Sequence, residues 1–103
     1  MSEYLADVRR YDAGADEAVV DKIVKHLGIA LRNRDSSLVS ATDPEELKRV
    51  RTNWVAKKLG VDYEAKGDEV VAHVAEVMKG DRNKNRVTFY YLVAKQLGKL
   101  GGL

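Results

Sequence analysis

The stretch Lys79–Leu100 reads KGDRNKNRVTFYYLVAKQLGKL and joins a polar, basic turn to the most aromatic and apolar run of the chain. Its apolar side chains recur at offsets of three, four, eight and eleven residues, which places them on one face of a helix. These residues are Phe89, Leu92, Val93, Leu97 and Leu100. A strand fits less well, because the apolar residues fall on both alternating faces. We therefore expect a helix that ends near Gly98 and forms the centre of the fold.

Four further segments show apolar residues at helical spacing, near residues 3–11, 17–28, 44–59 and 69–78. Asp16 and the run Thr42-Asp43-Pro44 have the composition of helix starts, and Gly67-Asp68 is read as the start of the fourth helix. Residues 32–42 lack a helical period and are expected to connect two helices. The sequence thus predicts an all-α fold, a compact array of about five amphipathic helices around one core, in a single domain spanning residues 1–103.

The composition is that of an ordinary globular chain, with 103 residues, 45% hydrophobic and 33% charged. The chain has no cysteine, which excludes disulfides and thiolate chemistry and suits a reducing compartment. No apolar run approaches the roughly 20 residues that a membrane span requires. We expect a cytoplasmic protein without a membrane partner.

Positive charge is concentrated near the C-terminus. Residues 79–103 carry six basic side chains and one acidic, whereas the first 78 residues carry twelve basic and fifteen acidic. Basic residues that alternate with aromatic ones can bind phosphates and stack bases. Phe89 belongs to the apolar face, but Tyr90 and Tyr91 are expected to expose their hydroxyls. The candidate interaction patch is Arg82, Lys84, Arg86, Tyr90, Tyr91, Lys95 and Lys99.

The turn at Asp81-Arg82-Asn83-Lys84-Asn85 places oxygen donors where an EF-hand loop has its first three ligands. The loop glycine is replaced by Arg86 and the bidentate glutamate by Leu92, and two cations lie between the donors. No metal is therefore expected, and the Asp and Asn side chains are better explained as caps of the following helix. A helix–loop–helix shape like that of an EF-hand, without its ion, stays open.

Other chemical signals are weak. His26 and His73 have no partner at metal-ligand spacing, and no nucleophile elbow, phosphate-binding glycine loop or dinucleotide motif is present. Trp54 lies at helical spacing from Val50 and is expected in the core. We find no catalytic set and expect no cofactor.

Several segments together resemble a known family. They are YLADVRRY at 4–11, AVVDKIVKHLG at 18–28, DSSLVS at 35–40, DPEEL at 43–47, KKLG at 57–60 and DRNKNRVTFYYLVAK at 81–95. Along essentially its whole length the chain resembles the bacterial, mainly alphaproteobacterial, domain of unknown function family 2853. The resemblance implies a compact all-α fold and no established activity or active site.

The leading hypothesis is a non-enzymatic protein-interaction module that binds another protein or a second copy of itself. The alternative is a nucleic-acid or acidic-partner binder that uses the basic C-terminal segment, for which binding should fall steeply with salt. An enzyme is a third possibility, which a polar cleft holding an acid or histidine with a strongly shifted pKa would indicate.

Overall fold

The computed structural model describes residues 2–33, 36–61 and 63–102 of the chain. In chain order the elements are α1 (Ser2–Arg9), α2 (Glu17–Leu27), η1 (Gly28–Arg32), β1 (Leu38–Val39), α3 (Pro44–Val50), η2 (Arg51–Ala56), α4 (Glu64–Val77), β2 (Lys84–Asn85), α5 (Arg86–Gln96) and η3 (Leu100–Gly102). Five α-helices carry most of the described chain, so the predicted all-α fold is confirmed.

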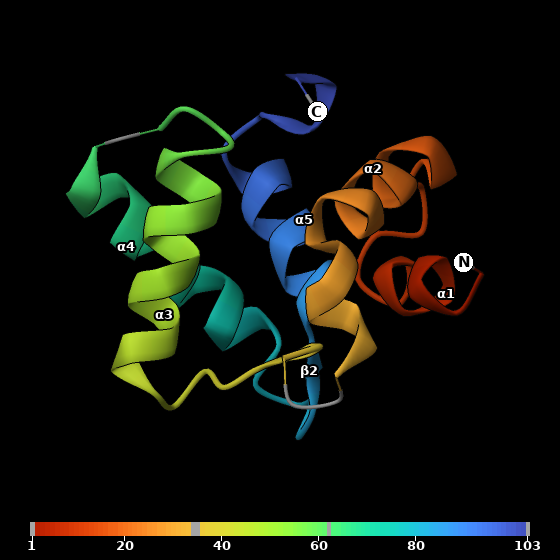
Figure 1. Cartoon of the computed structure of the whole chain (residues 1–103), viewed down its shortest axis with the longest axis horizontal. Helices are drawn as coiled ribbons and strands as arrows, with labels where there is room; N and C mark the ends of the chain where they lie inside the picture. The colour runs from red at the N-terminus through yellow and green to blue at the C-terminus, as the bar shows by residue number, and fades with distance from the viewer. Residues whose placement is uncertain (1, 34–35, 62, 103) are drawn as a thin grey trace.

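Helix α5 lies at the centre of the molecule, as predicted. Figure 1 shows it between two groups of helices, with α3 and α4 on one side and α1 and α2 on the other. It contacts both groups, and Phe89 and Val93 are fully buried in the shared core. The helices on either side are therefore joined mainly through α5.

The burial of α5 extends around the helix, which the single apolar face did not predict. Eight of its eleven residues are buried: Arg86, Val87, Thr88, Phe89, Tyr90, Tyr91, Val93 and Ala94. A helix that other elements cover on all sides needs no polar face toward water. Because α5 carries several polar side chains, these must find partners inside the protein.

Most of the helix starts follow the sequence signals. The side chains of Asp16, Asp43 and Asn85 accept hydrogen bonds from the backbone N–H groups of Ala18, Glu45 and Val87, at 2.9, 3.0 and 2.9 Å. Each bond satisfies one of the free donors at a helix N-terminus.

Helix α4 departs from the expected start. It begins at Glu64, so Gly67 is an interior helical residue and not a cap. The N-cap position is Tyr63, whose side chain makes no capping hydrogen bond. The expectation failed because glycine followed by aspartate also suits a helix interior when another residue needs the space beside the glycine.

The connector between η1 and α3 contains a short strand that the sequence did not indicate. Leu38 and Val39 in β1 pair antiparallel with Asn85 and Lys84 in β2. This pairing joins the loop before α3 to the loop before α5. In chain order, α4, the loop that contains β2, and α5 form a helix–loop–helix segment, whose likeness to an EF-hand stays a prediction.

Trp54 anchors the second group of helices to α5. It is fully buried, its ring stacks on Tyr90 with centroids 4.7 Å apart, and its Nε1 donates to the Tyr90 carbonyl at 3.0 Å. Trp54 lies in η2, a π-helical segment that continues α3. The predicted core position of Trp54 is confirmed. None of the helices in the described ranges combines the length and apolarity needed to cross a membrane.

Candidate functional site

Three members of the predicted interaction patch are buried. The exposed fractions are 8% for Arg86, 6% for Tyr90 and 2% for Tyr91. The expectation that both tyrosines expose their hydroxyls is therefore wrong. It failed because helix periodicity shows where apolar residues lie on a helix but not how many neighbours cover it.

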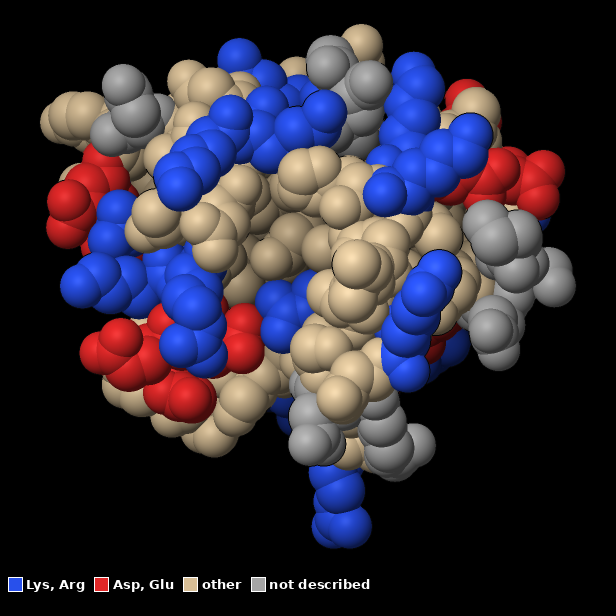
Figure 2. All heavy atoms as spheres, in the orientation of Figure 1, with Lys and Arg blue, Asp and Glu red and all other residues tan. Residues whose placement is uncertain are grey.

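The other four members do not form one surface with each other. Arg82 and Lys84 lie at the β2 end of α5, whereas Lys95 and Lys99 lie at or beyond its C-terminal end, on the opposite side of the molecule (Figure 1). Figure 2 likewise shows Lys and Arg spread over several elements of one face. Binding of nucleic acid or an acidic partner through this set stays a prediction.

Two of these four cations are also used inside the protein. Lys84 Nζ donates to the carbonyl of Asp81 at 2.8 Å, and Lys95 Nζ lies 3.0 Å from Asp12 Oδ2. A cation that already has a partner has less to gain from a phosphate or carboxylate of a ligand.

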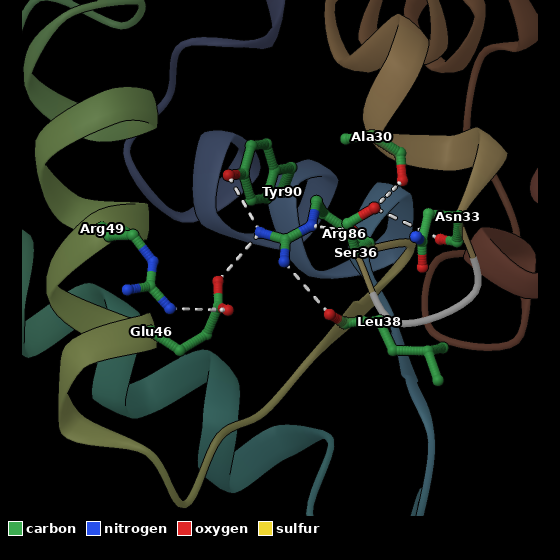
Figure 3. A network of polar contacts seen from close by, with 8 residues as sticks. All are labelled: Ala30, Asn33, Ser36, Leu38, Glu46, Arg49, Arg86 and Tyr90. Carbon is green, nitrogen blue, oxygen red and sulfur yellow. Dashed lines mark hydrogen bonds and ion pairs between the residues drawn. The ribbon is translucent and has the colours of Figure 1, made fainter.

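Arg86 is the centre of a polar network that joins α5, α3 and the segment around β1 (Figure 3). Its Nη1 lies 3.1 Å from Glu46 Oε1 in α3 and 3.3 Å from the Tyr90 hydroxyl oxygen. Its Nε and Nη2 donate to the carbonyls of Ser36 and Leu38. The network thus ties α5 to α3 and to the segment around β1.

The charge of Arg86 is stabilised by this network. Burial disfavours the charged form, but the contacts with Glu46 and Tyr90 outweigh it, so the pKa of Arg86 is raised. The side chains of Arg86 and Glu46 are only 10% and 14% exposed. Because Nε, Nη1 and Nη2 each have a partner, Arg86 acts as a structural cation.

A second set of polar contacts holds the N-terminal segment against α5 and the loop before it. Thr88 Oγ1 donates to Asp7, and the Tyr91 hydroxyl donates to Asp12 at 2.7 Å. The Tyr11 hydroxyl donates to Asp81 at 2.6 Å. These bonds join residues 70 to 81 positions apart, so they fix α1 and the turn after it on the rest of the fold.

The carboxylates of this set are stabilised in their ionised form. The hydrogen bond from Tyr91 is the main reason that the pKa of Asp12 is lowered, and the bond from Tyr11 does the same for Asp81. Burial and the Asp81 contact raise the pKa of Tyr11 to about 12. Ionised acids and protonated tyrosines at neutral pH are suited to holding the fold together. A general acid would need its pKa raised toward neutrality.

The described residues include no group of three or more His, Asp or Glu side chains placed to hold a metal ion. His26 lies against Trp54 with ring centroids 5.1 Å apart, and burial and the nearby Lys58 lower its pKa. His73 is exposed on α4.

A groove that the sequence did not indicate lies between α3, η2 and α4. Its volume is about 460 Å³, and it is open to solvent. It is lined by Pro44, Leu47, Lys48, Arg51, Glu64, Asp68, Val71 and Ala72. We call it the α3–α4 groove. It combines an apolar wall with two cations and two acids.

Arg51 is the most enclosed charge of this groove. Its side chain is 15% exposed, whereas those of its acidic neighbours Asp68 and Glu64 are 59% and 74% exposed. Arg51 Nε lies 2.6 Å from Asp68 Oδ1, and Nη2 lies 3.9 Å from Glu64 Oε1. The one signal in the sequence was Gly67, since glycine inside a helix usually has a packing or functional reason.

A smaller groove of about 290 Å³ lies between α4 and α5. It is lined by His73, Val74, Val77, Leu92, Lys95 and Gln96. Val77 is 45% exposed there, but Lys95 is already paired with Asp12. This groove therefore offers a weaker charged anchor than the α3–α4 groove.

The Arg86 network generates a stability prediction. We expect Glu46→Ala to lower the free energy of unfolding by about 3 kcal/mol, because it leaves a buried cation without its carboxylate. Glu45→Ala is the control, since the exposed Glu45 loses only a helix-dipole contact worth less than about 1 kcal/mol. Chemical denaturation measures both. Equal losses for the two variants would show that Arg86 does not depend on Glu46.

The lowered pKa values of Asp12 and Asp81 generate a pH prediction. A carboxyl group whose pKa is lower in the folded state stabilises the fold above the pKa of the unfolded state, near 3.8. That contribution is lost as the pH falls through the folded-state values below 3.8. We expect the stability of the native chain to fall more steeply below about pH 4 than that of the Asp12→Asn, Asp81→Asn variant. Unfolding free energies measured between neutral and acid pH check this.

The exposed Glu69 provides a matched control, because Glu69→Gln removes one carboxylate from the surface of α4. Its pH profile should follow that of the native chain. Parallel profiles for the native chain and the double Asp variant would contradict the role of these two carboxylates.

No curated protein matches the chain. A family model described as "Protein of unknown function (DUF2853)" matches residues 3–101, which is nearly the whole sequence. The chain therefore belongs to the DUF2853 family of proteins of unknown function.

Proposed function

We propose that this domain is a non-catalytic protein-interaction module and that its docking surface is the α3–α4 groove. The observation that carries the proposal is the enclosed Arg51 beside an apolar wall, in a groove that is open to solvent. Arginines at the centre of a desolvated patch are frequent anchors of protein interfaces.

The shape of the groove supports a protein partner. Leu47 of α3, which is partly exposed, and Ala72 of α4, which is exposed, lie on opposite helices and offer apolar surface, whose burial contributes about 25 cal/mol per Å². Small-molecule sites usually enclose most of their ligand. An open groove between two helices instead suits a helical or extended segment that lies along it.

The polar groups elsewhere support the same conclusion. Arg86, Asp12 and Asp81 are used in contacts that hold the helices together. Their pKa shifts favour fixed charges at neutral pH and not proton transfer. The groove, by contrast, holds charges whose partners are exposed.

Photo-crosslinking in cells of the source organism tests the proposal. A benzoylphenylalanine in place of Ala72 places the crosslinking group in the groove, because Ala72 is an exposed residue of the groove lining. The same amino acid in place of the exposed Lys22 on α2 is the control. We expect a discrete adduct, identified by mass spectrometry as one protein in repeated experiments, from position 72 only.

Adducts that are absent, or that are the same from positions 72 and 22, would contradict the docking surface. An adduct with a second copy of this chain would identify self-association through the groove.

A further inference from the structure

We infer that the α3–α4 groove recognises an acidic protein segment, and that Arg51 binds the partner's carboxylate in exchange for Asp68 and Glu64. The inference rests on the proposed function and adds the chemistry of the partner. Three independent features of the structure meet at Arg51: the position of its side-chain stem, the donors left on its guanidinium group, and the exposure of the acids that contact it.

The aliphatic part of the Arg51 side chain packs against α4 at Gly67, where the absence of a side chain leaves room for it. A Cβ atom at Gly67 would lie 2.9 Å from Arg51 Cγ and 3.2 Å from Cδ, so a larger residue there would displace the stem. Glycine inside a helix costs about 0.5–1 kcal/mol relative to alanine. The structure accounts for that cost, because Gly67 leaves the space in which Arg51 lies along the groove.

The backbone at Arg51 is also unusual. The π-helical segment η2 begins at this residue, directly after α3. Its wider turn is seen in the bonds from Lys57 N to the Thr52 carbonyl and from Leu59 N to the Trp54 carbonyl, each five residues apart. Segments of this kind are frequent at functional sites. Here the segment directs Trp54 into the core while Arg51 lines the groove.

The guanidinium group retains donors for a ligand. It carries five N–H donors, and a carboxylate can accept two of them in parallel. Nε lies 2.6 Å from Asp68, and its surroundings give it no well-aligned hydrogen bond. Nη2 lies 3.9 Å from Glu64 Oε1, which is too long for a hydrogen bond.

The acids now beside Arg51 are easily displaced. Asp68 and Glu64 are more than half exposed, and ion pairs with exposed carboxylates contribute little because water and salt compete with them. A partner carboxylate between the apolar walls would be shielded from water, which strengthens its attraction to Arg51. Lys48 adds a second cation to the same groove.

The partner segment therefore has two parts. One or more apolar side chains lie against Leu47 and Ala72, and an adjacent Asp or Glu lies on Arg51. A segment with a basic residue at that point would meet Arg51 with like charge.

The test uses two peptides and the full chain. The first is a 15-residue helical peptide with leucines on one face and glutamates beside them, and the second has glutamine in place of every glutamate. Titration of the glutamate peptide into the ¹⁵N-labelled protein should shift the NMR signals of groove residues. The glutamate peptide should bind at least tenfold more tightly than the glutamine peptide. Arg51→Gln should weaken binding of the glutamate peptide at least tenfold. Arg82 is an exposed arginine near β2, and Arg82→Gln should weaken the same binding less than twofold.

The double variant Glu64→Gln, Asp68→Asn is the sharpest arm. It removes the internal competitors, so the glutamate peptide should bind at least threefold more tightly. The same two substitutions in an Arg51→Gln background should give no such gain, whereas a merely structural Arg51 predicts the same gain in both backgrounds, because removing two acids favours any acidic peptide. Both substituted residues are exposed, so the variant should fold, and a thermal melt confirms that.

Four results would overturn the inference. They are equal binding of the two peptides, no binding of either at millimolar concentration, no gain in the double variant, and binding of a single-stranded oligonucleotide that Arg51→Gln abolishes. A groove adduct from position 72 together with equal peptide binding would leave the docking surface standing and remove only the recognition of a carboxylate.

Discussion

The burial of α5 on nearly all sides is the constraint from which the rest of the structure follows. A buried helix of apolar residues alone could be covered by any apolar surface. Helix α5 also carries Arg86, Thr88, Tyr90 and Tyr91, and each buried polar group needs a partner inside the protein. The surrounding elements must therefore supply specific groups at specific places, which selects one arrangement of the helices.

Those partners come from both ends of the chain's first half. The N-terminal segment provides Asp7 and Asp12 for Thr88 and Tyr91, and α3 provides Glu46 for Arg86. The β1–β2 pairing holds the segment around Leu38 where its carbonyl can accept from Arg86. Polar contacts thus determine how the two helix groups are placed about α5, while apolar burial at Phe89 and Val93 supplies the driving force.

The parts of this fold that depend on local chemistry were predictable from the sequence. Asp16, Asp43 and Asn85 cap helices because capping involves residues two or three positions apart. The central position of α5 followed from its high density of aromatic and apolar residues. The burial of Tyr90 and Tyr91 was not predictable, since the Tyr91 partner Asp12 lies 79 positions away and one sequence does not show which segments meet. The two-residue strands are likewise too short to leave a pattern.

The candidate site was missed for a related reason. Gly67 has the same local appearance whether it starts a helix or leaves space for a side chain from another helix, and here Arg51 takes that space. The basic residues predicted to form one patch are separated because they lie at the two ends of α5. A count of charges along the sequence does not show that separation. A surface formed by two helices can be identified only once the three-dimensional arrangement of those helices is known.

Native-state hydrogen exchange tests the central claim most directly. If α5 is the helix that the others enclose, the amides of Val87–Ala94 exchange only through global unfolding, with an opening free energy equal to that from denaturation, whereas α1 amides exchange through smaller openings. Exchange of the α5 amides at a lower free energy than those of α2 or α4 would contradict the account.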